Sequence, residues 1–530
     1  MTFAEQLQEI RHYRNAYFLA VSAAMGSVFY GYDIGIIGGV ITLPAFKTYF
    51  GINEMSASAK AALSGNIVSI LQGGCFVIQA VVGLGTNRAN ALSVLYFARF
   101  FAGLGVGMVS ALVPAYVSES VPRRIRGRCT GMVQMANNVG IMLSYWVNYS
   151  ASINISGTTD TQWRMPFAVQ VFPGVLFCLL VPFQPESPRF LVEHGQYDRA
   201  ARSLAFVART TPDDKAVLAT IEEIKADFAN SSNLSVLQQI FHMFDSRAIA
   251  LRCLIPSLVM FFQQWTGTNA INYFSPQAYL CVTGDQRDDV GATCDWYALP
   301  CVYGVVKVIS ISLVLAFAVE GIGRKKCLII GGLGQGAMML WLGGYTGIHP
   351  SSNIVPASYV SIIAVYLYAV FYCVGWGPLP WVVAGEVAPN HLRTGAMSIA
   401  VGVNWLFSFT ISKLTPIMLN NIKYGTFLLF GFCCLFMALW AYACLPETTG
   451  YALEDIHLLF EKDVILRSVE DAPGGRFFLG TRRAAPIEKL RREHTGERNR
   501  DVDEGEDEKR AIDLESGDRK DSELADVDPI

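Results

Sequence analysis

The sequence predicts an all-α polytopic membrane protein, and its composition and its apolar patterning carry this prediction. Of its 530 residues, 52% are hydrophobic and only 16% are charged, whereas a soluble domain carries about 25% charged residues. Apolar runs of about 20 residues, the length that crosses a ~30 Å hydrocarbon core, recur along the chain. Helices are the expected form of these runs, because a helix satisfies all its backbone hydrogen bonds internally.

Eleven apolar runs have this length, and they set the order of the predicted helices. They are Ala16–Leu43, Ala61–Leu84, Ala91–Val117, Thr130–Tyr149, Met165–Phe183, Leu251–Tyr273, Leu299–Val319, Cys327–Tyr345, Ile354–Val383, Gly395–Leu419 and Thr426–Leu445. The net charge of −3 provides no basic field for nucleic acid. The seven histidines stand in no metal-binding spacing, so we expect no metal centre.

Charged residues divide the chain into parts and orient it. Basic clusters at Arg123–Arg128 and Arg324–Lys326 mark cytoplasmic loops. The sequons at Asn148 and Asn154 then fall on the external side. The predicted parts are a cytoplasmic N-terminus (1–15), a first transmembrane half (16–185), a helical cytoplasmic linker (186–248), a second transmembrane half (249–445) and a cytoplasmic tail that is largely disordered (446–530).

The two transmembrane halves repeat each other. Glu119, Pro122 and Arg126 have the same spacing as Glu386, Pro389 and Arg393. Pro-Glu-Ser at 185–187 and Pro-Glu-Thr at 446–448 close the two halves. Parallel duplicated halves are typical of transporters that bind substrate between the halves near the membrane midplane.

The first half is shorter than the second. Asp33 and Glu119 are 86 positions apart, whereas Asn269 and Glu386 are 117 apart, a difference of 31. We therefore expect about one span and a basic loop, of the kind seen at Arg324, to be absent from the first half. The junction is expected near Val77–Val82. A genuine eleven-span protein is the alternative, and strict alternation of its spans would place the N-terminus outside.

Six motifs in order carry a family resemblance. They are Tyr-Gly-Tyr-Asp-Ile-Gly at 30–35, Arg-Phe-Phe-Ala-Gly-Leu-Gly-Val-Gly at 99–107, Pro-Glu-Ser-Pro-Arg at 185–189, Gln-Gln-Trp-Thr-Gly-Thr-Asn at 263–269, Gly-Pro-Leu-Pro-Trp at 377–381 and Pro-Glu-Thr-Thr-Gly at 446–450. The chain resembles the sugar porters of the major facilitator superfamily, in the style of a fungal member. The resemblance implies two six-helix pseudo-repeats, here with about 11 spans because one first-half helix is missing.

Asp33 is an acid within an apolar run, a placement that costs about 2.5–3.5 kcal/mol on insertion scales and calls for a partner or a role. Arg99, early in another run, is the expected partner. The resemblance implies that this pair couples transport to protons. A purely structural ion pair is the alternative.

Amides and aromatic residues provide the expected substrate site. Amides both donate and accept hydrogen bonds, as sugar hydroxyls do. The expected substrate-binding residues are Gln134, Gln263, Gln264, Asn269, Tyr273, Trp381 and Asn404. The alternative is that these amides bridge helices. No cation other than Arg99 is assigned near this site, which favours a neutral sugar over the quinate anion.

Charged residues at the cytoplasmic ends of the runs resemble a gating network of the family. They are Glu119, Arg126, Glu186, Arg189, Arg324, Glu386, Arg393 and Glu447. Such a network can bias a transporter between conformations, whereas anchoring by basic residues is the simpler explanation.

Together these features predict a monosaccharide–proton symporter that works by alternating access. A quinate or polyol permease and a non-transporting sugar sensor are the alternatives. No enzyme motif is present, and no cofactor is expected beyond the proton gradient. The partners are a small sugar, a proton and the lipid bilayer, with no nucleic acid. The oligomeric state is open, and the plasma membrane is the expected location.

Overall fold

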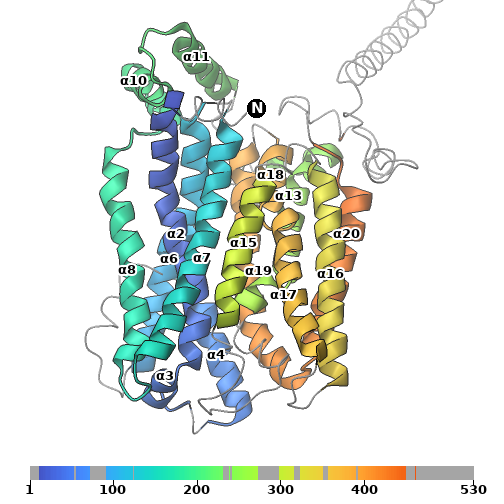
Figure 1. The fold of residues 1–530 in the computed structure, drawn as a ribbon. Coiled ribbons are helices and arrows are strands. Elements are labelled where there is room, and N and C mark those ends of the chain that lie inside the picture. The colour runs from blue at the N-terminus through green and yellow to red at the C-terminus, as the bar shows by residue number, and fades with distance from the viewer. Residues whose placement is uncertain are drawn as a thin grey trace, which may run out of the picture.

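The computed structural model is a helical protein whose helices form two bundles (Figure 1). It describes residues 11–52, 55–71, 91–122, 125–230, 238, 241–272, 298–315, 323–349, 356–389, 392–448 and 460. No strand occurs among these residues. Residues 446–448 and 460 are the described part of the predicted tail, and the rest of it lies outside.

The first bundle comprises five long helices and a short one, which follow the predicted runs. They are α2 (Arg14–Thr42), α3 (Pro44–Tyr49), α4 (Ala57–Leu71), α6 (Ala91–Ser120), α7 (Arg126–Asn154) and α8 (Thr161–Leu180), which continues into the 3-10 turn Val181–Phe183. The linker then forms α9 (Pro188–Glu193), α10 (Tyr197–Ala208) and α11 (Lys215–Asn230). These three helices pack around their own small apolar cluster, so the linker is helical as predicted.

The second bundle repeats the arrangement with one more helix. Its helices are α13 (Arg247–Trp265), α15 (Ala298–Leu313), α16 (Arg324–Ile348), α17 (Pro356–Val374), α18 (Leu379–Val387), α19 (Arg393–Asn421) and α20 (Gly425–Cys444). Each of the eleven predicted runs overlaps a helix, and among the described residues eight helices are both long and apolar enough to cross a membrane. The prediction of an all-α membrane fold is confirmed.

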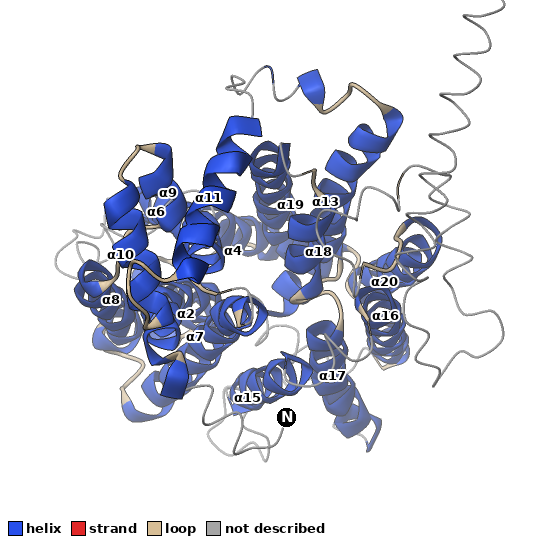
Figure 2. Cartoon of the chain, turned by 90° about the horizontal axis from the view of Figure 1, so that it is seen from above, coloured by secondary structure: helices blue, strands red, loops and turns tan. Residues whose placement is uncertain are grey.

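The bundles meet along two seams. Helix α7 packs against α15, and α4 packs against α19, as Figure 2 shows from above. Because each seam joins the first bundle to the second, the region between the seams can present residues from both bundles to one ligand. We call these two contacts the bundle seams.

Glycines bring the backbones of α2 and α7 into direct contact. A Cβ at Gly31 would overlap the backbone carbonyl of Asn137, and one at Gly140 would overlap the carbonyl of Val28. Gly35 faces the Ser144 hydroxyl in the same way. Small residues at such positions are what allow transmembrane helices to approach closely. The glycines of the motif at 30–35 therefore have a packing role.

The N-terminal end of α2 lies beside the linker. Asn15 Nδ2 donates to the carbonyl of Phe206 in α10 over 2.8 Å. Tyr116, near the end of α6, donates to the carbonyl of Pro185. We call this end of the molecule the linker end, and α3 and α4 lie at the opposite end (Figure 1). The N-terminal side of α2 and the Arg126 start of α7 thus share one end, which contradicts a strict alternation of eleven complete spans.

One helix of the second bundle has no described counterpart. In order along the chain, α2 corresponds to α13, α4 to α15, α6 to the α17–α18 pair, α7 to α19 and α8 to α20. Helix α16, which packs against α17 and α20, is left over. The described length of α4 is 15 residues, or about 22 Å, against a ~30 Å core. The predicted junction at Val77–Val82 lies outside the described residues, so the missing span stays a prediction.

One predicted glycosylation site is wrong. Asn148 is 3% exposed, and its Nδ2 donates to the carbonyl of Ile36 in α2 over 2.9 Å. A side chain packed between two helices cannot carry a glycan. Asn154 is exposed at the end of α7 that lies away from the linker end, so it remains the candidate acceptor.

Candidate functional site

Two broken helices lie against each other in the second bundle. The first break follows α13, where Gly267 has a φ of +82° that favours glycine. The second break separates α17 from α18 at residues 375–378. Non-helical backbone is tolerated at membrane depth only where protein or a water-filled cavity satisfies it. Breaks of this kind are typical of transport sites.

Each break is stabilised by a side chain from the other broken helix. Tyr368 of α17 donates over 2.9 Å to the carbonyl of Thr266, which lies at the first break. In return, Gln263 Nε2 donates to the carbonyls of Trp376 and Gly377 over 2.9 and 2.8 Å. The carbonyls that the breaks remove from helical hydrogen bonding therefore have partners, and the two breaks depend on each other.

Two of the predicted substrate-binding amides belong to the hydrogen bonds that stabilise the two helix breaks. Gln263 Oε1 accepts a hydrogen bond from Asn404 Nδ2 at 2.9 Å, and the same Asn404 nitrogen reaches the carbonyl of Met260 at 3.2 Å. Both amides are at most 5% exposed. Their donors are thus used by the protein, as the helix-bridging alternative expects.

The other amides keep atoms that a ligand can use. Asn269 Nδ2 donates to Gln264 Oε1 over 2.6 Å and to Ser408 Oγ over 3.0 Å. Within the described ranges, Gln264 Nε2 and Asn269 Oδ1 have no protein partner. The side chain of Gln134 on α7 is half-buried, and the described residues offer it no hydrogen bond. These three residues present both donors and acceptors.

Of the two aromatic residues predicted for the substrate site, the structure describes only Trp381. Trp381 of α18 is half-buried and packs on one side against the core of the second bundle. Its other side is therefore partly open. Tyr273 lies outside the described residues, so its expected role in binding substrate stays a prediction.

Asp33 is buried in the first bundle beside an amide. It is 1% exposed, and its Oδ1 accepts a hydrogen bond from Gln170 Nε2 of α8 at 2.8 Å. Arg99 belongs to α6, but its side chain lies outside the described part of the structure. The ion pair between Asp33 and Arg99 therefore stays a prediction. The sequence analysis did not identify Gln170 as the partner of Asp33. The two residues are 137 positions apart, and no local pattern indicates a contact over that separation.

A buried lysine that the sequence analysis did not assign lies next to the second break. Lys307 of α15 is 2% exposed. Its Nζ lies 3.4 Å from Asn272 Oδ1, and 5.6 and 5.1 Å from the ring centres of Tyr303 and Tyr372. A single basic residue within the predicted run Leu299–Val319 was the available signal, since an ionisable group inside the membrane is a functional candidate by default.

The linker end of the second bundle holds a charge network, as the resemblance implies. Arg324 pairs with Glu386 over 2.9 Å, and Thr448 donates to the other oxygen of the same carboxylate over 2.8 Å. Glu447 accepts hydrogen bonds from the backbone N–H groups of Arg324 and Lys325 at the start of α16. This network ties α16, α18 and the chain after α20 together. Arg393, also predicted for it, opens α19.

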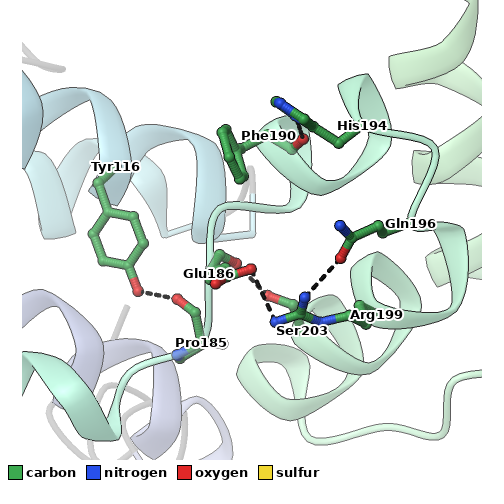
Figure 3. A network of polar contacts seen from close by, with 8 residues as sticks. All are labelled: Tyr116, Pro185, Glu186, Phe190, His194, Gln196, Arg199 and Ser203. Atoms are coloured by element: carbon green, nitrogen blue, oxygen red, sulfur yellow. Dashed lines mark hydrogen bonds and ion pairs between the residues drawn. The ribbon is translucent and has the colours of Figure 1, made fainter.

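The first bundle repeats part of this network. Ser187 donates to Glu119 over 2.7 Å, as Thr448 does to Glu386. Glu186, which corresponds to Glu447, pairs instead with Arg199 of α10 over 3.1 Å (Figure 3). Arg126 begins α7 and Arg189 lies in α9. The expected absence of a first-half basic loop that would correspond to Arg324 stays a prediction.

Comparison with protein families gives a match over most of the chain. The family described as "Sugar (and other) transporter" matches residues 19–90 and 73–460. The two matched segments overlap at 73–90, where the predicted junction Val77–Val82 lies.

Named relatives and solved structures agree with this match. A probable quinate permease of Aspergillus fumigatus is 31% identical over 489 residues, which cover 85% of this chain and 88% of that protein. The MFS-type transporter qa-x of Neurospora crassa is 29% identical over 84% of this chain and 88% of its own length. The proton:xylose symporter XylE bound to 6-bromo-6-deoxy-D-glucose has a TM-score of 0.67 at 24% identity, covering 85% of this chain and 100% of that one. These likenesses confirm the predicted major facilitator fold.

Proposed function

We propose that this chain, which belongs to the sugar transporter family of the major facilitator superfamily, moves a small polyhydroxylated solute together with a proton. The observation that carries the proposal is the division of polar groups between the bundles. A buried acid with an amide partner belongs to the first bundle, and amides with unused hydrogen-bonding atoms belong to the second. Alternating access would open the region between them to each side of the membrane in turn.

The acid is suited to bind a proton. The side chain of Asp33 is 1% exposed, so bulk water does not solvate its carboxylate. Gln170 Nε2 donates to the carboxylate, while Gln170 Oε1 is buried and, in the described structure, accepts no hydrogen bond. After rotation of its amide, Gln170 can accept from the protonated acid instead. The same neutral partner thus supports both protonation states, as a residue that repeatedly gains and loses a proton requires.

The solute site follows from the remaining amide atoms. Gln264 Nε2 can donate to a hydroxyl oxygen, Asn269 Oδ1 can accept from a hydroxyl, and Gln134 of the facing bundle can do either. Trp381 adds an apolar surface for a sugar ring. These groups fit a monosaccharide, and they fit equally the hydroxyls of quinate, which the Aspergillus relative is named for.

The test is uptake by the purified full chain in liposomes with an inward proton gradient. We expect accumulation of labelled glucose, xylose or quinate above equilibrium, and loss of accumulation with a protonophore. Asn269→Ala removes one hydrogen bond to the solute, worth about 1 kcal/mol, besides its two bonds within the protein, so KM should rise at least about fivefold. Asn420→Ala on the exposed end of α19 is the matched control and should leave KM unchanged. Binding of solute without uptake would contradict transport and favour a sensor.

A further inference from the structure

We propose that Lys307 binds the carboxylate of the transported solute, so that the substrate is a polyhydroxylated monocarboxylate rather than a neutral sugar. The inference rests on the proposed function, because it names the substrate class of the same site. It begins from the charge of one side chain. Lys307 is 2% exposed in the middle of an apolar helix, where a cation is costly unless an opposite charge meets it.

Protein groups meet this charge only weakly. The ammonium has three donors. Among the described residues its oxygen partner is Asn272 Oδ1, which lies 3.4 Å away and also accepts a hydrogen bond from the Tyr303 hydroxyl. Two tyrosine rings supply the remaining contacts. No ion pair joins Lys307 to a carboxylate anywhere in the described ranges. The ammonium therefore retains capacity for an anion that no described residue provides.

Lys307 also lies at the solute site. Its partner Asn272 follows Asn269 by three residues, and residues three apart share one face of a helical turn. Tyr145 of α7 donates to the Asn272 carbonyl over 2.9 Å, so this turn touches the first bundle. Lys307 is therefore linked through Asn272 to the same short helical segment that carries Asn269, beside the α7–α15 seam.

The net charge that crosses the membrane depends on both Lys307 and Asp33. Tyr372 of α17 lies against the ammonium, whereas Asp33 belongs to α2 of the other bundle. A monocarboxylate on Lys307 and a proton on Asp33 enter as an electrically neutral pair. A neutral sugar with a proton would instead carry one positive charge across the membrane.

The first experiment compares two ligands that share their hydroxyls and ring and differ at the carboxyl group, which is charged in one and esterified in the other. The thermal stability of the purified full chain is measured with quinate and with its uncharged methyl ester. A charged hydrogen bond predicts at least about tenfold tighter binding of quinate. Lys307→Met should abolish this preference but keep ester binding, and Lys307→Arg should retain part of it. Lys413→Met, an exposed lysine of α19, is the matched control. Equal binding of both ligands by the unmodified chain, or an unchanged preference in Lys307→Met, would overturn the inference.

A second measurement needs no variant. In liposomes, one net charge moved with each solute would change the equilibrium accumulation about 50-fold per 100 mV. We expect quinate uptake driven by a pH gradient to be unaffected by a potassium–valinomycin potential. A 50-fold response, or accumulation of glucose with no competition by quinate, would overturn the inference. Quinate binding that depends on Lys307 without any uptake would support the lysine's role and refute transport, so the two failures are distinguishable.

Discussion

Gln263 and Gln264 are neighbours in the chain, but the structure predicts that removing Gln263 lowers the stability of the protein, whereas removing Gln264 mainly weakens solute binding. Gln263→Ala deletes three hydrogen bonds, two to the broken-helix carbonyls of Trp376 and Gly377 and one from Asn404. Hydrogen bonds in membrane proteins average about 0.6 kcal/mol, so the three account for about 2 kcal/mol. Each buried carbonyl left without a partner adds about 1–3 kcal/mol. With two carbonyls affected, we therefore expect a loss of about 4–8 kcal/mol in the free energy of unfolding.

Gln264→Ala is the matched control. It deletes one protein hydrogen bond, from Asn269, and should cost about 0.6 kcal/mol of stability, while solute binding weakens about fivefold. Both variants are compared by SDS titration of the purified protein, with ligand-dependent stabilisation as the binding measurement. Equal stability losses, or a stable Gln263→Ala protein that has lost binding, would refute this division of roles.

Three further substitutions test other contacts. Asp33→Asn cannot ionise, so accumulation against a gradient should disappear while downhill exchange of labelled solute continues; retained accumulation would contradict a proton role. Gly140→Val places a side chain against the backbone of α2 and should abolish the monodisperse fraction on size-exclusion chromatography, whereas Gly107→Ala, which faces open space, should not. Glu386→Gln removes the charge that Arg324 meets and should lower the free energy of unfolding by about 1.5–3 kcal/mol; an unchanged SDS midpoint would argue that the pair contributes nothing.

The sequence predicted the helices well because the bilayer fixes how long an apolar run must be. The repeated Glu-Pro-Arg spacing likewise predicted the related environments of Glu119 and Glu386, each of which accepts a hydrogen bond from the hydroxyl residue that follows its half. Both predictions rest on residues close together in the sequence, whose structure depends little on how distant parts of the chain pack.

The roles of individual polar residues depend on distant contacts and could not be predicted in the same way. Gln263 and Gln264 point in directions about 100° apart on one helix, and only the break between α17 and α18 decides which of them is used by the protein. The partner of Asp33 on α8 depends on how α2 and α8 pack against each other. Lys307 was visible in the sequence, but its position beside Asn272 was not.

The direct backbone contact between α2 and α7 has a mechanical consequence. Interlocked side chains can slip past each other by changing rotamer, but two backbones in contact leave no room for such a change. Asp33 and Gln134, one on each of these helices, therefore travel as parts of a single rigid piece. Lys307 and Asn269 belong to the other piece. In the proposed mechanism, the first body carries the proton on Asp33 and one solute contact through Gln134, whereas the second body carries the other solute contacts. A bound solute would therefore bridge the two bodies, and the proton site would move together with one of its walls.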